Sequence, residues 1–445
     1  MQQGKRIGVI GGGFAGLTAA YRLAKSGHDV VLWERNQYGG QAGTFPVGDT
    51  QLEIFYHHLF QSDRAIADLA EELGIGDKLE WLPSSVGYFM DGQIYPLNGA
   101  LDVLKLGSIP LQDRIRLGAV TFYLQHVKDW KKFESVTAHA WLERALGKRA
   151  YDKTLGAQLR AKFGRYYDQV AMVWFWGKIW LRTTSRKNPL EQEKLGYFSG
   201  SFRTMVDALV EGCERAGVTM RLGDPITKLQ QDDDASDWTV TTESLANPEH
   251  FDAIIATVPS PVFQKMVPTL PDSYRAKLNR LKYEAAVVAI LELDRPLTDI
   301  YWLNIADDEM PFTGIIEHTN FVDPEVYGGR RFVYLSKYLE PDHPYFSMDD
   351  AHLIDEYTPH LKKVNPDFDS GWIRNTWVFR ERAAQPIIPL NYSQMIPPHR
   401  TPLKGLYLAN TTQIYPEDRG TNYSVRLGND IARLVNDDLG TAESD

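Results

Sequence analysis

The 445-residue chain contains a single cysteine, Cys213. One thiol cannot form an intramolecular disulfide, a C-x-x-C redox pair or a thiolate metal cluster, so these kinds of site are excluded. Cys213 lies in residues 205–216, which have helical periodicity, and we expect it to be buried and inert. Histidines are scattered except for His57 and His58. Adjacent side chains on a strand point to opposite faces, so this pair cannot chelate a metal jointly, and no metal site is expected.

Long apolar runs and an excess of basic residues are also missing. No apolar run approaches the ~20 residues of a membrane-spanning helix, so no transmembrane segment is predicted. Lys and Arg number 48 against 58 Asp and Glu, which gives a formal charge of −10 at pH 7. This balance does not favour a nucleic acid as a partner. Residues 1–5 lead directly into residues 6–10 (RIGVI) with no apolar signal segment between them, so we expect a cytoplasmic location.

The most informative stretch of the sequence is residues 6–34. Residues 6–10 (RIGVI) predict a buried strand of a parallel sheet. Residues 14–25 predict a helix that ends at Gly27, and residues 29–33 (DVVLW) predict a second strand. The turn between the first strand and the helix reads G-x-G-x-x-G. In this strand–turn–helix–strand context the pattern predicts a Rossmann-type dinucleotide site.

Each glycine of this pattern, and the acid that follows it, has a physical role. Gly11 permits the tight turn, Gly13 lets a pyrophosphate approach the backbone, and Gly16 lets the helix pack closely on the strand. The N–H groups and the dipole of the helix N-terminus attract phosphates. Glu34, at the carboxyl end of the second strand, can accept hydrogen bonds from both ribose hydroxyls and would repel a 2′-phosphate.

A second glycine-rich loop, residues 39–44 (GGQAGT), follows Glu34. It stands where a nicotinamide-dependent enzyme normally begins its next helix. The additional backbone surface suits a cofactor that extends across the edge of the sheet, which indicates FAD. No second G-x-G-x-x-G follows a strand, so we expect NAD(P)H to reduce the flavin slowly or not at all.

The C-terminal region supplies a third element of the predicted site. Residues 405–410 predict a strand, residues 415–422 a turn, and residues 423–435 a helix with Thr421 or Asn422 as its N-cap. The dipole of this helix would face N1 and O2 of an isoalloxazine, where negative charge develops on reduction. Together with the two N-terminal loops, the segment would close the sheet over one cofactor.

The order of elements predicts an α/β fold class. Residues 101–182 have mostly helical periodicity, and residues 283–340 are β-rich. We expect a discontinuous Rossmann-type FAD-binding domain and a mixed α+β substrate domain with a helical insertion. The FAD-binding domain is predicted in three pieces, residues 1–85, 196–270 and 401–445. The substrate domain is predicted in two parts, a helical part (86–195) and a β-rich part (271–400).

These segments together resemble the flavin-containing amine oxidase superfamily, which includes protoporphyrinogen oxidases, phytoene desaturases and, more distantly, UDP-galactopyranose mutases. The resemblance covers nearly the full length and rests on VIGGGFAGLTAAYRLAKSGHDVVLWER, GGQAGT, GYFSGSFRTMVDAL, DAIIATVPS, GLYLAN and DRGTNYSVRLGNDIA. It implies that FAD contacts Gly11, Gly13, Phe14, Ala15, Gly16, Glu34, Arg35, Gly40, Gln41, Ala42, Gly43, Thr44, Ile226, Val258, Gly420, Thr421 and Asn422.

Two features depart from the superfamily pattern. The strand before the last helix usually ends in Gly-Glu or Gly-Asp, but Asn410 and Thr411 stand there. Asp418 is therefore the candidate for the ribityl contact. The flavin-facing lysine of the superfamily cannot be placed by any motif. Because Cys213 is far in sequence from the flavin-facing segments, FAD is expected to be bound non-covalently.

Three histidines are candidates for catalysis. His57 and His58 follow the second glycine loop at about the interval at which mutase-like members place a histidine beside the flavin. Only one of the two can face the flavin, and an unperturbed pKa of about 6.5 would suit proton transfer near N5. His318, in a run of polar residues, is the third candidate. A packing role is the alternative for each.

The sequence predicts an FAD-dependent oxidoreductase. It would remove a hydride from a C–N or C–C bond of a small organic substrate and pass the electrons to O2 or another acceptor. Lys178, Arg182 and Arg186 recur on one helical face and could bind an anionic substrate, with a solvated face as the alternative.

The first rival function is a redox-neutral flavin mutase acting on a nucleotide sugar, which needs reduced flavin and a basic anion-binding cluster. The second is a non-catalytic flavin- or isoprenoid-binding protein.

Overall fold

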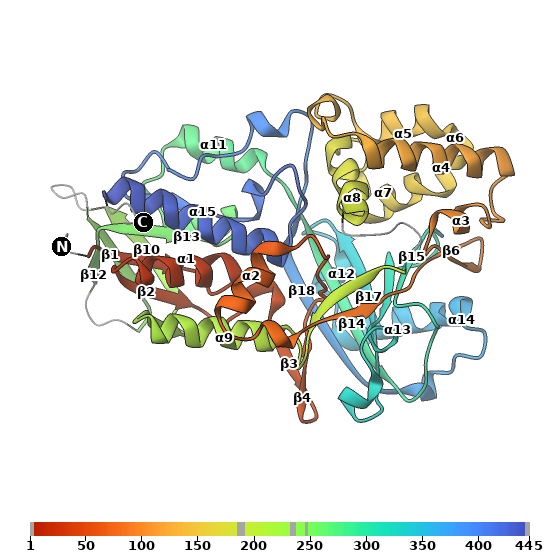
Figure 1. Ribbon diagram of the computed structural model, residues 1–445, viewed down its shortest axis with the longest axis horizontal. Helices are drawn as coiled ribbons and strands as arrows, with labels where there is room; N and C mark the ends of the chain where they lie inside the picture. Colours follow the sequence, from red (N-terminus) through yellow and green to blue (C-terminus); the bar gives the residue numbers. More distant parts are fainter. Residues whose placement is uncertain (1–3, 185–191, 232–236, 245–247, 441–445) are drawn as a thin grey trace.

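A computed structural model describes residues 4–184, 192–231, 237–244 and 248–440 of the chain (Figure 1). A parallel five-stranded sheet, in the order β19-β13-β1-β2-β9, forms one end of the molecule. Three distant parts of the chain contribute its strands. They are β1 (Arg6–Ile10), β2 (Asp29–Glu34), β9 (Thr219–Leu222), β13 (Ala253–Ala256) and β19 (Leu406–Leu408).

The parallel strands are buried on both faces, which explains their continuous apolar sequences. Ile7 and Val9 belong to one hydrophobic cluster, together with side chains of the helices on that face. Ile10 belongs to another cluster, with side chains of a three-stranded antiparallel sheet. The helices of the first face are α1 (Phe14–Lys25), α2 (Arg64–Glu72), α9 (Phe202–Arg215) and α15 (Thr421–Leu439). The antiparallel sheet consists of β10 (Ile226–Gln231), β11 (Trp238–Thr242) and β12 (Glu249–Phe251).

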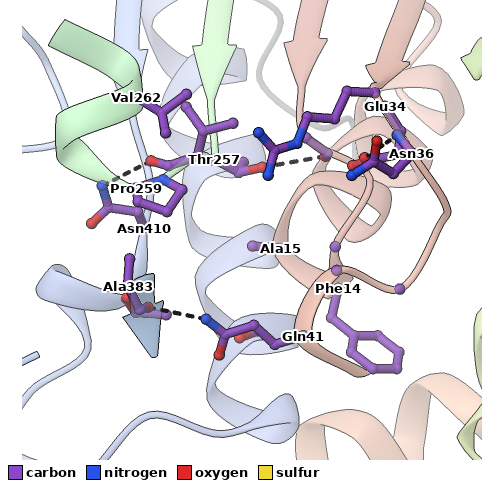
Figure 2. A pocket seen from close by; sticks show the side chains of 18 of the residues that line it. Phe14, Ala15, Glu34, Asn36, Gln41, Thr257, Pro259, Val262, Ala383 and Asn410 are labelled. Carbon is purple, nitrogen blue, oxygen red and sulfur yellow. Dashed lines mark hydrogen bonds between the residues drawn. The ribbon is translucent and has the colours of Figure 1, made fainter. Parts of the chain in front are cut away.

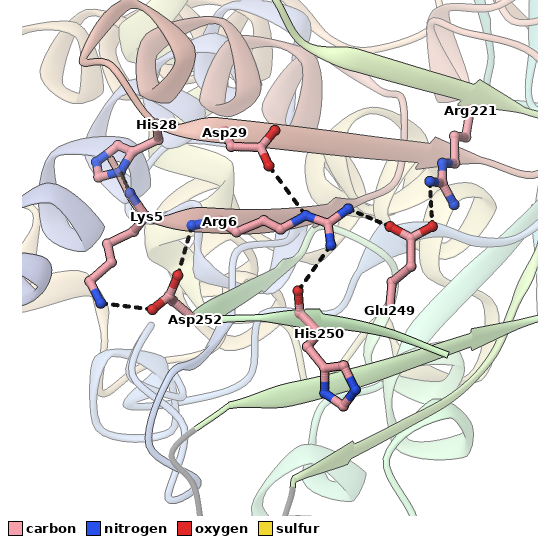
Figure 3. A network of polar contacts seen from close by, with 8 residues as sticks. All are labelled: Lys5, Arg6, His28, Asp29, Arg221, Glu249, His250 and Asp252. Atoms are coloured by element: carbon pink, nitrogen blue, oxygen red, sulfur yellow. Dashed lines mark hydrogen bonds and ion pairs between the residues drawn. The ribbon is translucent and has the colours of Figure 1, made fainter. Parts of the chain in front are cut away.

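The first strand is fixed at its N-terminal end by a polar network (Figure 3). The Asp252 carboxylate accepts hydrogen bonds from the Lys5 ammonium and from the Arg6 backbone N–H, both at 2.8 Å. The Arg6 guanidinium pairs with Asp29 at 3.2 Å and with Glu249 at 2.5 Å. Asp252 also separates β12 from β13, which belong to different sheets. The chain changes sheet at this residue.

A mixed seven-stranded sheet, in the order β18-β14-β17-β16-β15-β6-β7, lies beside the parallel sheet. Its strands are β6 (Val86–Met90), β7 (Gln93–Pro96), β14 (Tyr283–Leu293), β15 (Trp302–Ile305), β16 (Gly314–Glu317), β17 (Arg331–Leu339) and β18 (Ile373–Pro386). Two strand pairs complete the β-structure: β3 (Thr44–Val47) with β4 (Thr50–Glu53), and β5 (Leu79–Pro83) with β8 (Lys194–Phe198).

A group of helices forms a separate layer next to this sheet (Figure 1). Its members are α3 (Ala100–Val103), α4 (Leu111–His126), α5 (Ala138–Leu146), α6 (Lys148–Lys153), α7 (Leu155–Phe163) and α8 (Met172–Thr184). The remaining helices are α10 (Ser260–Met266), α11 (Asp272–Arg280), α12 (Pro344–Ser347), α13 (Asp350–Tyr357) and α14 (Leu361–Val364). In the part of the chain that the structure describes, no helix is both long and apolar enough to cross a membrane.

The predicted helical part, residues 86–195, is not helical at its start. Val86 pairs in parallel with Trp302, so β6 joins the seven-stranded sheet, and β7 follows it as a hairpin partner. Residues 86–90 carry apolar side chains on both faces of a strand, and their partner β15 lies more than two hundred residues later in the chain. This long-range pairing leaves no local signal.

Candidate cofactor site

A cavity of about 610 Å³ lies at the carboxyl ends of the parallel strands. Residues that directly follow four of these strands line it, namely Gly11 after β1, Arg35 after β2, Thr257 after β13 and Ala409 after β19. This edge is where open parallel sheets bind their ligands, and the volume is in the range of ~300–1,000 Å³ that is usual for ligand sites.

The G-x-G-x-x-G turn has the geometry that its glycines require. Gly11 has φ 106°, in the left-handed region. A Cβ at Gly16 would lie 1.9 Å from the Gly11 carbonyl oxygen, so any side chain there would push α1 off β1. Gly13 has extended backbone (φ −78°) and precedes α1 as its N-cap. A Cβ at Gly13 would meet nothing closer than Gly40 Cα at 3.9 Å, so it would point into open space.

The Glu34 carboxylate is oriented by two backbone amides. One oxygen accepts a hydrogen bond from the Gly12 N–H at 2.8 Å, and the other accepts one from the Asn36 N–H at 2.9 Å. Each oxygen of an ionised carboxylate can accept a further hydrogen bond. Glu34 therefore faces the cavity with acceptor capacity left for ribose hydroxyls (Figure 2).

The second glycine-rich loop contacts the first. The Gly39 N–H donates to the Gly12 carbonyl at 2.8 Å, and a short turn over Gly40–Ala42 follows. The Gln41 side-chain amide donates to the Ala383 carbonyl at 3.0 Å, which joins the loop to β18 across the cavity (Figure 2).

Most of the predicted cofactor residues line this cavity: Gly11, Gly13, Phe14, Ala15, Glu34, Arg35, Gly40, Gln41, Ala42, Ile226, Val258, Gly420 and Thr421. Five do not: Gly16, Gly43, Thr44, Asp418 and Asn422. Gly43 and Thr44 form the end of the second glycine-rich loop, where the Thr44 hydroxyl donates to the Gln51 side chain at 2.9 Å.

The start of α15 differs from the prediction. Its N-cap is Gly420, and both Thr421 and Asn422 lie within the helix. The Asn422 side-chain oxygen accepts a hydrogen bond from the Ile66 N–H at 3.2 Å. Asn422 therefore links α15 to α2 instead of facing the cavity.

Asp418 is unsuited to the predicted ribityl contact because its carboxylate is already occupied. It pairs with Lys178, and it accepts hydrogen bonds from Trp174 Nε1 at 3.2 Å and Gln385 Nε2 at 2.8 Å. Burial opposes ionisation of the Asp418 carboxyl. The charges of Lys178, Lys162 and Arg419 outweigh this effect and hold the pKa of Asp418 well below its usual range.

Sequence reasoning missed a part of the cavity wall that β18 contributes. Arg380, Glu381 and Ala383 line the cavity. The β14 partners of Gln385 and Glu381 are two positions apart, whereas Gln385 and Glu381 themselves are four positions apart in β18. This bulge turns the Ala383 carbonyl toward Gln41, and no residue pattern in the sequence announces it.

The three candidate histidines occupy different environments. His57 lines the cavity, and its Nδ1 lies 2.6 Å from the Phe55 carbonyl oxygen. His58 does not line the cavity; its Nδ1 lies 3.0 Å from the Tyr301 hydroxyl, and its ring packs against Trp302.

His318 lies in the protein core rather than at the cavity. It is 1% exposed, and its Nε2 lies 2.7 Å from the Tyr327 hydroxyl. The unperturbed pKa of about 6.5 that the sequence suggests for the flavin-facing histidine holds for neither His57 nor His58. Removal of water by the surrounding protein lowers the pKa of His57 to about 4 and that of His58 and His318 to about 3.

Replacing His318 with glutamine should reduce the acid sensitivity of the fold. The native pKa lies below the unfolded value, so only the unfolded state binds a proton as the pH falls below about 6.5. The wild type should therefore lose about 2 kcal/mol more than His318→Gln between pH 6.5 and 5, at ~1.4 kcal/mol per pH unit. Urea unfolding at both pH values measures the difference. Equal losses in the two proteins would contradict the neutral, buried state of His318.

Among the described residues, no group of three or more His, Cys, Asp or Glu side chains could hold a metal ion. Cys213 is fully buried in α9, with its Sγ 3.4 Å from the Leu17 carbonyl oxygen, and it does not line the cavity.

Comparison with known proteins identifies the family. The model of the family described as flavin containing amine oxidoreductase matches residues 14–416. The chain belongs to this family. Membership makes it an FAD-dependent oxidoreductase, which confirms the enzyme class that the sequence predicts.

Two relatives illustrate the breadth of this flavin containing amine oxidoreductase family. The 15-cis-phytoene desaturase of Narcissus pseudonarcissus is 22% identical over 448 residues, which cover 93% of this chain and 76% of the relative. A putative flavin-containing monoamine oxidase of Mycobacterium tuberculosis is 26% identical over 176 residues, 37% of this chain and 38% of the relative.

Solved structures show that the fold is shared. A putative protoporphyrinogen oxidase from Exiguobacterium has a TM-score of 0.77 at 16% identity. The superposition covers 98% of this chain and 99% of the oxidase chain. Reduced UDP-galactopyranose mutase has a TM-score of 0.73 at 17% identity, with 98% and 94% covered. These similarities confirm the predicted α/β fold class.

Proposed function

We propose that the cavity binds FAD non-covalently and that the enzyme oxidises a small organic substrate by removing a hydride from a C–N or C–C unit. The observation that carries this proposal is the convergence of three chain regions on one cavity at the carboxyl ends of the parallel strands. FAD, when bound, supplies the acceptor for the hydride, and O2 or another acceptor then removes the electrons.

The residues present fit this cofactor. Gly13 leaves space for the pyrophosphate, and Glu34 has acceptor capacity for the adenosine ribose. At the opposite part of the cavity, Gln41, Gly420 and Thr421 surround the position we assign to the flavin. The burial of Cys213 away from the cavity supports non-covalent attachment.

His57 is the proposed proton acceptor. Its Nδ1 donates to the Phe55 carbonyl, which leaves Nε2 with a free lone pair. Because its pKa is lowered to about 4, the imidazole is neutral at pH 7 and can accept a proton. In the oxidation of an amine or of a saturated C–C unit, the carbon loses a hydride and the neighbouring nitrogen or carbon loses a proton.

The decisive experiment is anaerobic mixing of the purified yellow protein with candidate amines, porphyrinogens, carotenoid precursors and nucleotide sugars. We expect bleaching of the flavin absorbance by one class and release of FAD on denaturation. Colourless protein that fails to bind added FAD would overturn the proposal. A ligand that binds without bleaching the flavin and without being converted to product would instead indicate a non-catalytic binding protein.

One observation favours the mutase as the second candidate function. That reaction needs a basic cluster for a nucleotide diphosphate, and Arg419 at the cavity lies near Lys162 and Lys178. Product formation from a nucleotide sugar by the reduced enzyme, without any electron acceptor, would identify it. Rapid bleaching by NADPH would also favour it, since its chemistry starts from reduced flavin.

A further inference from the structure

A group of charged side chains adjoins the cofactor cavity, and we call it the basic cluster: Lys162 on α7, Lys178 on α8, and Asp418 and Arg419 before α15. Arg419 also lines the cavity. Lys178 pairs with Asp418, whose side chain is only 8% exposed. Within the described residues, Lys162 and Arg419 form no ion pair with any carboxylate at 4 Å or less. Arg186 lies outside those residues.

The charges of the basic cluster do not balance. Three cations face one carboxylate, which leaves two positive charges in excess. A further acid whose pKa Lys162 influences, Glu284, is fully buried, and within the described part of the chain neither of its carboxyl oxygens has a hydrogen-bond partner. Burial, and then the charge of Glu340, raises the pKa of Glu284 to about 8, so this group is mostly protonated at neutral pH and compensates little. Desolvated cations are normally paired, and unpaired ones are characteristic of binding sites.

Tyr338 of β17 brings the two unpaired cations together. The Arg419 Nη2 donates to the Tyr338 hydroxyl at 2.9 Å, and the Lys162 Nζ lies 4.5 Å from the centroid of the same ring. The Lys162 Nζ is also 5.0 Å from the Trp174 ring centroid. Arg419 Nε is buried and has no hydrogen-bond partner in the part of the chain that the structure describes. Lys162 therefore lies beside two aromatic rings, one of which also binds Arg419, and neither Lys162 nor Arg419 Nε has an anionic acceptor among the described residues.

We propose that the basic cluster binds an anionic group of the substrate, a carboxylate or a phosphate, through Lys162 and the free Arg419 Nε. This inference rests on the proposed function and names the substrate class: organic anions with an apolar or aromatic body beside Trp174 and Tyr338. Because Arg419 belongs to both the cluster and the cavity wall, a bound anion would hold the rest of the substrate next to the cofactor.

Calorimetric titration of the FAD-loaded enzyme, at constant ionic strength, tests the proposal. The probes are benzoate, its uncharged analogue benzamide, and inorganic phosphate. We expect saturable binding of benzoate or phosphate and at least tenfold weaker binding of benzamide. The tighter of the two anions identifies the group that the cluster recognises.

Variants separate charge recognition from folding. Lys162→Met should weaken anion binding at least tenfold without lowering the thermal unfolding midpoint, because among the described residues Lys162 has no carboxylate partner that its removal would leave unpaired, and the methionine stem can still pack on the two rings. Lys162→Arg should retain binding. Lys148→Met is the matched control, since Lys148 is 75% exposed and pairs with Asp152 on the surface of α6; its affinity should equal that of the wild type.

Two outcomes would overturn the proposal: benzamide binding as tightly as benzoate, or Lys162→Met binding the anion as tightly as the wild type. FAD content is measured before each titration. Loaded enzyme that binds neither anion would refute the anion site and leave the proposed function intact, whereas protein that cannot be loaded with FAD would refute the proposed function itself.

Discussion

Replacing Gly13 with valine is expected to abolish stable FAD binding while leaving the fold intact. The backbone of Gly13 is extended (φ −78°, ψ 177°), a conformation that valine adopts readily, so no strain is introduced. The new side chain would point into the open space beside Gly40, where we place the pyrophosphate. Losing about two charge-assisted hydrogen bonds of ~1.5–3 kcal/mol each would weaken binding by about a hundredfold or more.

The flavin-to-protein ratio after purification, and titration of the apoprotein with FAD, measure this effect. Gly118→Val is the control, because a Cβ at Gly118 on α4 meets nothing within 4 Å and is remote from the cavity. It should purify with wild-type FAD content. Normal FAD affinity of Gly13→Val, with an unchanged unfolding midpoint, would show that the pyrophosphate lies elsewhere.

The sequence predicts this part of the site well because its determinants are local. Residues 6–34 contain a strand, a turn, a helix, a second strand and its terminal acid in one continuous run. The φ of Gly11, the close approach of Gly16 to Gly11 and the contact of the Gly12 amide with Glu34 all follow from neighbours within this run. A turn of this kind can be identified without knowledge of the remaining chain.

The remaining part of the site depends on contacts between distant residues. Asp418 looks like a free acid near a glycine turn, but its partners at Trp174, Lys178 and Gln385 come from other elements. His318 follows the short strand β16, and its polar neighbours suggest a solvent-facing position at the end of this strand. Its actual partner is Tyr327 in the core. Such pairings are set by the tertiary fold and leave no periodicity in the sequence.

The domain division stays a proposal, with one adjustment. We propose an FAD-binding domain from residues 1–85, 196–270 and 401–445, which contain all strands of the parallel sheet. Within the proposed substrate domain, residues 86–96 belong with the β-rich part, because β6 and β7 extend the seven-stranded sheet. β5 lies at the end of the first piece of the proposed FAD-binding domain, and it pairs with β8. β8 spans the proposed boundary between residues 195 and 196, so this pairing connects the two domains.

Alanine substitutions at His57 and His58 are expected to have different consequences although the residues are neighbours. His57 lines the cavity and has a free Nε2, so His57→Ala should slow flavin reduction by substrate by about a hundredfold, the usual size of a general-base contribution. His58 packs among Phe60, Tyr301 and Trp302. His58→Ala should instead lower the unfolding free energy by ~1–3 kcal/mol and keep a near-wild-type rate. Both variants should stay yellow.

Stopped-flow reduction under anaerobic conditions and urea unfolding separate the two effects. His352→Ala is the control for both, since its side chain is 79% exposed. The rate constant of the wild type should be independent of pH from 7 to about 5 and fall only near pH 4, because protonation of His57, with its pKa lowered to about 4, removes the proton acceptor. Wild-type rates in His57→Ala would assign proton transfer to another group. His318 could not replace it, because its Nε2 is bound to Tyr327 in the core, away from the cavity.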